Sequence, residues 1–294
     1  MGGILPGARC MLNAMHGRAW MALTAALLVS GCTGTLVTFP SATPAAPFTI
    51  AAHEWRPAGA GPFPAVVLLH GCDGVSPSTR SWARWLRERG WVALVVDSWG
   101  PRAIRDGCLP GPELPNTVRF DDAVGALRWL HGQSYVDRDR VGVVGWSNGG
   151  VFAIALVNGP SLARARARGV EVPAPGFRAA VAFYPGGCWS LAHERVERPL
   201  LVLMGDADDW TVPGPCVEMV EAMRGRGADA RIVLYPGAVH YFDVEEQPPA
   251  VLAEVENRNR PGGCCGARVG YDGPAAADAR RRVTEFLGHH LGGR

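Results

Sequence analysis

Short, almost wholly apolar runs alternate along the chain with segments of helical spacing. Runs of this length without polar alternation are typical of strands that are buried on both faces. They predict strands at residues 64–70, 91–96, 140–144, 177–183, 200–204 and 230–234. Between them, apolar residues spaced for one helical face predict helices at residues 78–89, 121–130, 149–157 and 275–287.

Local signals at the helix ends support this pattern. Before helix 78–89, Ser76 can cap the helix with Pro77 at its first position, or Ser78 can cap it two residues later; Gly90 ends it. Strands that alternate with helices form a mostly parallel sheet with helices on both faces. The sequence therefore predicts an α/β domain over residues 48–294.

The N-terminal 31 residues have a different pattern. An apolar run at 19–29 follows Arg9 and Arg18 and is about half the ~20 residues that a membrane-spanning helix needs. A charged start, a short apolar centre and small residues at the end are typical of a secretory signal. The sequence LVSGC at 28–32 resembles a bacterial lipobox, which predicts lipidation of Cys32 after cleavage. Met11 or Met15 as the start would give a more ordinary signal length.

The next segment, residues 32–47, is rich in Thr, Pro and Ala, and we expect a flexible tether there. The alternative is a periplasmic protein cut nearby, with Cys32 incidental. In both cases the protein is exported. The only membrane contact that we expect is through a lipid anchor on Cys32.

Charge and composition exclude several classes. Apolar residues make up 48% of the chain and charged residues 19%, which is typical of a globular protein. Two of the 29 basic residues lie in the signal, which leaves 27 against 27 acidic residues. A balanced domain has no overall attraction to nucleic acid.

The motif Gly145-Trp146-Ser147-Asn148-Gly149 joins the strand RVGVV to an apolar helix. A G-x-S-x-G sequence is weak alone, but between a strand and a helix it predicts a nucleophile elbow. Ser147 would then be the nucleophile, and the amide of Asn148, at the helix N-terminus, would stabilise an oxyanion.

A serine nucleophile needs a base and an acid that orients it. His240 follows a strand near the chain end and fits the chain order Ser, acid, His of α/β-hydrolases. Between them, the turn after strand 200–204 holds three acids, of which Asp208 is the first candidate, Asp209 the second and Asp206 the third.

The sequence HGCDG at 70–74 follows an earlier strand, where a second oxyanion donor is expected. We expect that donor to be the amide of Cys72, and the ring of His70 to brace the loop.

Together, HGCDG, DSWGPR (97–102), GWSNGG (145–150), GDADD (205–209) and YPGAVHYFD (235–243) resemble the dienelactone hydrolase family of α/β-hydrolases from about residue 48 to the end. The family's namesake enzymes use a Cys nucleophile where this chain has Ser147. The resemblance implies an α/β-hydrolase fold, no cofactor and a small ester-like substrate.

Six cysteines remain after Cys10 and Cys32. In an exported domain they predict disulfides. Cys188 and Cys216 follow adjacent predicted strands, as do Cys72 and Cys108, so each pair could meet. The spacings lack the paired C-x-x-C of a zinc site, and no metal is predicted.

The sequence thus predicts an exported serine hydrolase that cleaves an ester, thioester or lactone. Two alternatives stay open: a peptidase or cutinase-like depolymerase with the same triad, and a binding lipoprotein that has lost activity. Specificity is expected to lie in the loops at 101–116 and 241–263.

Overall fold

A computed structural model describes residues 34–109, 115, 117–191 and 194–293. The predicted signal, Cys32 and part of the loop at 101–116 lie outside these residues. An eight-stranded sheet forms the centre of the domain in the order β1-β2-β4-β3-β5-β6-β7-β8. Its strands are β1 (Thr35–Pro40), β2 (Thr49–Trp55), β3 (Phe63–Leu69), β4 (Val92–Asp97), β5 (Val136–Trp146), β6 (Ala180–Phe183), β7 (Leu200–Gly205) and β8 (Ala230–Tyr235).

From β4 to β8 every neighbouring pair of strands is parallel, whereas β1 and β2 are antiparallel additions at one edge. The inner strands β3, β4 and β7 are buried along almost their whole length, as their unbroken apolar runs predict. Parallel strands end at the same edge of a sheet, so the loops after β3, β5, β7 and β8 lie together there.

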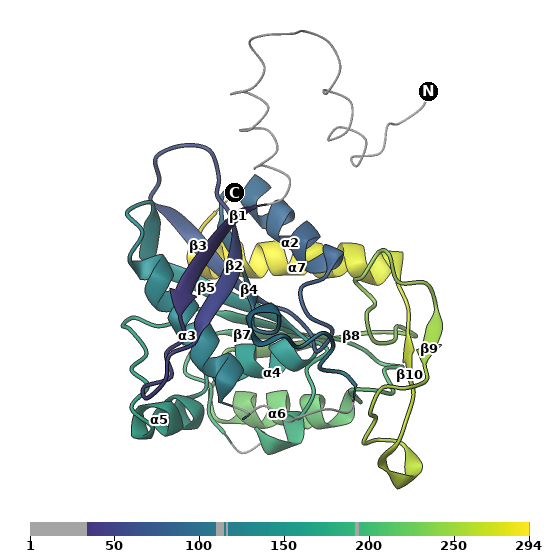
Figure 1. Ribbon diagram of the computed structural model, residues 1–294. Helices are drawn as coiled ribbons and strands as arrows, with labels where there is room; N and C mark the ends of the chain where they lie inside the picture. Colours follow the sequence, from purple (N-terminus) through teal and green to yellow (C-terminus); the bar gives the residue numbers. More distant parts are fainter. Residues whose placement is uncertain (1–33, 110–114, 116, 192–193, 294) are drawn as a thin grey trace, which may run out of the picture.

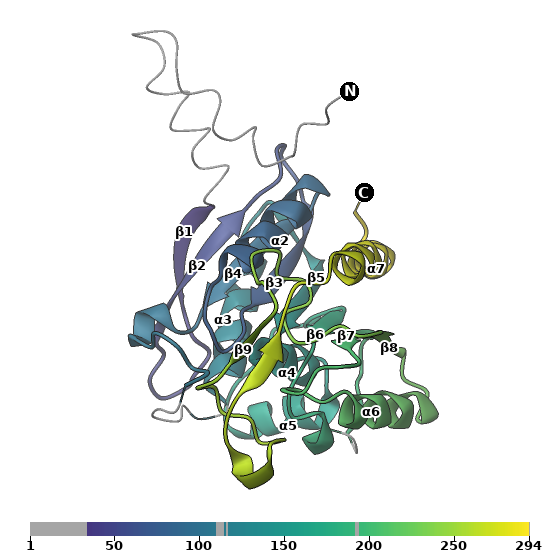
Figure 2. The same cartoon turned by 90° about the vertical axis from the view of Figure 1, so that its right-hand side faces the viewer.

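Helices cover both faces of the sheet. They are α2 (Pro77–Glu88), α3 (Val118–His131), α4 (Asn148–Ala155), α5 (Gly159–Ala167), α6 (Gly214–Gly225) and α7 (Gly273–Leu291). Helices α2 and α7 lie on one face, with α3, α4 and α6 on the other (Figures 1 and 2). The predicted α/β-hydrolase architecture is confirmed.

The start of α2 follows its sequence signal. The Ser76 hydroxyl accepts a hydrogen bond from the Thr79 amide at 3.1 Å, and Pro77 occupies the first helical position. Of the two predicted caps, Ser76 is the one that the structure uses.

The prediction of a flexible tether at residues 32–47 is wrong for residues 35–40. These residues form β1, which pairs with β2 from Thr35 opposite Glu54 to Pro40 opposite Thr49. The composition suggested a linker, but Thr, Val and Phe are also good strand formers, and Phe39 is buried in the core. Just before the strand, Gly34 lies so close to the Trp55 ring that a side chain would not fit.

A small excursion separates β8 from the closing helix. It contains β9 (Ala250–Leu252) and β10 (Ala267–Val269), which pair antiparallel, and a single turn of 3₁₀-helix at Pro261–Gly263. Figure 1 shows this excursion at the right of the view, at one side of the sheet. None of the helices in the described part of the chain is long and apolar enough to cross a membrane.

Candidate active site

Ser147 occupies a sharp turn between β5 and α4. Its backbone has φ 51° and ψ −116°, a left-handed conformation that is strained for a residue with a side chain. Glycine is required on both sides of the turn. A side chain at Gly145 would collide with the carbonyl of Gly149, and one at Gly149 would collide with the carbonyl of Leu69. This is the predicted elbow geometry, with Ser147 held at the carboxyl end of β5.

Asp208 and His240 lie together at the same edge of the sheet. The Nδ1 atom of His240 is 2.8 Å from Oδ2 of Asp208, and both side chains are fully buried. The other oxygen of Asp208 accepts hydrogen bonds from the amides of Trp210 and Thr211, each at 2.9 Å. A carboxylate held this way accepts the Nδ1 proton, which leaves Nε2 of His240 as the basic nitrogen.

The pKa of Asp208 reflects these contacts. Burial raises it, but the charge and hydrogen bond of His240 and the bonds from Thr211 lower it more, so the net shift is below the ordinary value of 3.8. Asp208 is therefore ionised at neutral pH.

The other two acids of the turn face elsewhere. Asp209 pairs with Arg260 at 2.8 Å and with Arg268 at 3.2 Å, which ties the turn to the β9–β10 excursion. Asp206 accepts a hydrogen bond from the amide of Gly237. Of the three candidates, Asp208 is the one that the structure brings to the imidazole.

The structure does not join Ser147 to His240 by a hydrogen bond. Nε2 of His240 is buried and has no hydrogen-bond partner within the described residues. Hydrogen bonds between a nucleophile and its base are often long before substrate binds.

The two predicted oxyanion donors are both free. Among the described residues, the amides of Cys72 and Asn148 have no hydrogen-bond acceptor. The Cys72 carbonyl, in contrast, accepts from Trp99 Nε1 at 2.7 Å and from the Gly107 amide at 2.8 Å. Holding the carbonyl fixes the plane of the loop and leaves the N–H groups available for a ligand.

His70 braces this loop, as predicted. The Ser98 amide donates to its Nε2 at 3.2 Å, so the proton must sit on Nδ1, which lies 2.6 Å from the Gly71 carbonyl. Burial and the nearby charge of Arg119 lower the pKa of His70 well below 6.5. His70 is thus a neutral ring with both nitrogens engaged.

Sequence reasoning missed a cluster of side chains around His240. The ring of Tyr184 lies over the imidazole at 4.3 Å between centroids, with Trp210 at 4.8 Å and Tyr241 at 4.9 Å. Tyr184 and Tyr241 also have positive φ values, of 34° and 64°. Strained backbone therefore gathers at this site, as it does at functional sites in general.

Asp243 organises the same cluster. It is buried, and its carboxyl group accepts hydrogen bonds from Tyr184 at 2.6 Å, Trp146 at 2.8 Å and Trp82 at 2.9 Å. Burial raises the pKa of Asp243 and these three hydrogen bonds lower it. The effect of burial is larger, so the pKa lies above its ordinary value. Asp243 ends the YPGAVHYFD motif, but nothing in the motif showed which donors it would meet.

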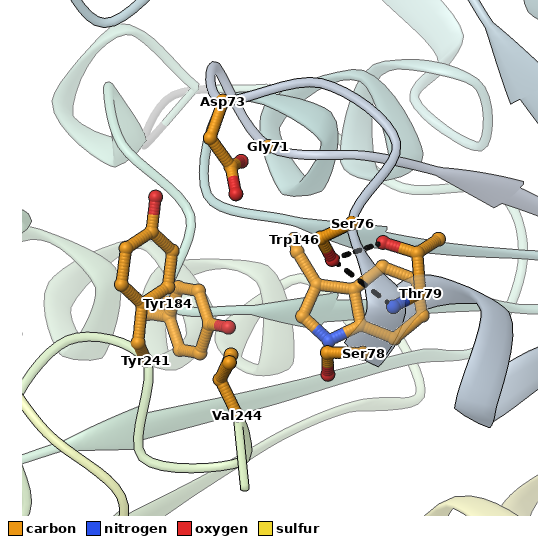
Figure 3. Close-up of a pocket in the computed structure, with 9 residues that line it drawn as sticks. All are labelled: Gly71, Asp73, Ser76, Ser78, Thr79, Trp146, Tyr184, Tyr241 and Val244. Atoms are coloured by element: carbon orange, nitrogen blue, oxygen red, sulfur yellow. Dashed lines mark hydrogen bonds between the residues drawn. The ribbon is translucent and has the colours of Figure 1, made fainter. Parts of the chain in front are cut away.

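A narrow cavity of about 10 Å³ opens beside the elbow, with room for roughly one water molecule. Figure 3 shows Tyr184, Tyr241, Trp146 and the carboxyl group of Asp73 around it, with the start of α2 at one side. Asp73 is exposed as a whole residue, but burial of its carboxyl group raises its pKa.

Both predicted disulfides are present. Cys72 pairs with Cys108, and Cys188 pairs with Cys216, with 4.9 Å between Cα atoms in each pair. The adjacent Cys264 and Cys265 also pair. Among the described residues there is no free cysteine and no group of three or more His, Cys, Asp or Glu side chains that could hold a metal ion.

The model of the dienelactone hydrolase family matches residues 50–291, which is most of the chain. The chain belongs to the dienelactone hydrolase family. The resemblance seen in the motifs is thereby confirmed.

The chain is similar to several known proteins. A probable 2-oxo-3-(5-oxofuran-2-ylidene)propanoate lactonase from a Bradyrhizobium species is 24% identical over 213 residues, covering 64% of this chain and 76% of its own. The structure of a putative dienelactone hydrolase from Klebsiella pneumoniae superposes with a TM-score of 0.61 at 21% identity, covering 87% of this chain and 99% of its own.

The apo form of Thermogutta terrifontis esterase 2 has a TM-score of 0.64 at 19% identity and covers 90% of this chain and 97% of its own. At these identities the structural likeness shows the shared fold. Membership of the dienelactone hydrolase family supports hydrolase activity for this chain.

Proposed function

We propose that this member of the dienelactone hydrolase family is an exported serine hydrolase that cleaves an ester, thioester or lactone. The observation that carries the proposal is the strained turn at Ser147, which lies at the same sheet edge as the buried Asp208–His240 pair. Two free amides, those of Cys72 and Asn148, flank this edge.

The chemistry follows from these positions. Nε2 of His240 takes the proton of Ser147 as its oxygen attacks the substrate carbonyl, and the amides of Cys72 and Asn148 bind the resulting oxyanion. Asp208 stabilises the charged imidazole. The imidazole then gives its proton to the leaving alcohol, thiol or lactone oxygen, and an acyl-serine remains. Water, activated by His240, releases the acid and restores Ser147.

Two experiments test the proposal. Ser147→Ala should fold normally and lose hydrolysis of p-nitrophenyl acetate by at least ~10⁴-fold, because triad members act as a unit. A fluorophosphonate probe should label the natural protein and leave the variant unlabelled. Ser190→Ala, a change in an exposed hydroxyl, is the matched control. A folded Ser147→Ala protein with near-natural activity would contradict the proposal.

A panel of short and long acyl esters, thioesters, lactones and peptides then separates the substrate classes. Cleavage of peptides alone would point to the peptidase alternative, and absence of probe labelling would point to an inactive binding protein.

Export is proposed from the signal-like N-terminus together with the two long-range disulfides, since such bonds persist in oxidising compartments. The anchor is proposed from the lipobox alone. Cys32→Ala should move the protein from the membrane fraction to a soluble or unprocessed form. Membrane association that is unchanged in this variant would count against lipidation.

A further inference from the structure

Arg119, in the first turn of α3, is buried with 3% of its surface exposed. Its guanidinium lies beside the rings of Trp99 and Phe152, 4.8 Å and 5.6 Å from their centroids. Burial lowers its pKa to about 10, partly offset by the charges of Asp122 and Asp73, so the group remains a cation at neutral pH.

This cation has no direct carboxylate partner among the described residues, and its Nε has no hydrogen-bond partner there. A buried charge without an ion pair is costly to fold, and Arg is almost never fully buried unless it is paired. Two neighbouring arginines differ in this respect: Arg102 pairs with Asp122, and Arg168 pairs with Asp121.

The hydrogen-bond acceptors of Arg119 lie on the two segments that carry the proposed oxyanion donors. Nη1 donates to the side-chain oxygen of Asn148, and Nη2 donates to the carbonyl of His70 at 2.6 Å. Asn148 carries one free amide of the site. The His70 carbonyl begins the Gly71–Cys72 segment that carries the other.

We propose that Arg119 is a positioning residue that joins the two halves of the oxyanion hole through one rigid guanidinium. This inference rests on the proposed function. The planar fork fixes the distance between the start of α4 and the loop after β3, which come from separate parts of the chain. Its positive charge, held in a poorly solvated place, also favours negative charge on the oxygen that these amides bind.

The role predicts a specific kinetic signature. Arg119→Met should lower kcat for p-nitrophenyl acetate by ~10- to 100-fold, somewhat less than loss of a donor that touches the oxyanion. KM should change less than about threefold, because a ground-state carbonyl needs these donors less than the oxyanion does. Arg119→Lys keeps the charge but cannot bond both segments in a fixed fork, so its kcat should fall between those of Met and the natural residue.

A transition-state analogue separates positioning from general stability. A trifluoromethyl ketone forms a tetrahedral adduct with the serine, and the adduct places an oxyanion between the two amides. Its affinity should fall in Arg119→Met by the same factor as kcat/KM. Arg168→Met is the matched control: it removes a cation that also bonds α3, so it should lower the melting temperature and leave both kinetic quantities within about threefold.

The outcomes are distinct. Folded Arg119→Met with natural kcat or natural affinity for the ketone would overturn the inference while leaving the proposed function intact. If this variant fails to fold, the same two measurements on Arg119→Lys decide the question. If Ser147→Ala remains active in the same assay, the proposed function itself fails and this inference fails with it.

Discussion

The phenol ring of Tyr184 lies over the imidazole of His240, with 4.3 Å between ring centroids, while its hydroxyl is bonded to Asp243. Asp243, three positions after His240 in the chain, thus holds the tyrosine that packs against the His240 ring. Asp243 also holds Trp146, which precedes Ser147. One buried group therefore fixes side chains next to both the predicted nucleophile and the predicted base.

We expect the stability of the domain to depend strongly on Asp243. Asp243→Ala leaves three buried donors without an acceptor, and unfolding free energy should fall by about 3 kcal/mol or more. Tyr184→Phe removes one bond and should cost about 1 kcal/mol. Urea unfolding measures both, with Tyr235→Phe, whose hydroxyl bonds Asp278 near the surface, as a control of smaller effect. Equal losses in all three variants would contradict this account.

The two acids of the turn should have different roles. Asp208→Asn should lower kcat by ~10⁴-fold, because an amide holds the wrong tautomer of His240. Asp209→Asn breaks surface ion pairs to Arg260 and Arg268, so its kcat should change less than tenfold. Ester hydrolysis by the two purified variants gives the ranking, and the reverse order would show that the acid has been misassigned.

Asp208 should also make stability depend on pH. Its pKa in the folded protein is below 3.8, so its ionised form stabilises the fold; this contribution is complete above the unfolded pKa and is lost as pH falls through the folded value. The difference in unfolding free energy between the natural protein and Asp208→Asn should therefore shrink between pH 5 and pH 2.5. A difference that stays constant over this range would be inconsistent with ionised Asp208.

The two long-range disulfides should affect different properties. Each closes a loop, with its cysteines 36 or 28 positions apart, and its removal should cost about 4 kcal/mol in the chain-entropy model. Cys72→Ser with Cys108→Ser should also lower kcat, because Cys72 carries a proposed oxyanion donor. Cys188→Ser with Cys216→Ser should lower mainly the melting temperature. With Cys264 and Cys265 the domain has six cysteines. Thiol titration of the denatured, unreduced protein should find two or fewer reactive thiols among these six, and six would end the disulfide prediction.

Much of the fold could be predicted because the signals are local. The buried strands are continuous apolar runs, and the elbow needs glycines on both sides of Ser147. The order of Ser147, Asp208 and His240 along the chain then follows from the order of the strands that carry them. Cys72 with Cys108 and Cys188 with Cys216 could be recognised as pairs able to meet, because each pair follows neighbouring strands, but the sequence alone left the pairing open.

The parts that could not be predicted depend on contacts between distant segments. Arg119 and Asn148 are 29 positions apart, and no local pattern shows that the first turn of α3 directs its guanidinium inward to Asn148. Asp243 meets Trp82 across 161 positions. The strand β1 was missed because its Thr, Val and Phe suit either a linker or a strand, and only pairing with β2 decides between them.

Strand β1 also bears on how an anchored protein would face its surroundings. Since β1 is antiparallel to β2, and β2 to β4, β1 runs in the same direction as the parallel strands, and Thr35 lies at their amino end. Only two residues separate Thr35 from Cys32, a reach of about 10 Å. A lipid on Cys32 would then hold the amino edge of the sheet against the bilayer. The opposite edge, with Ser147, Asp208 and His240, would face away from the lipid, open to esters dissolved in water rather than to those embedded in the membrane.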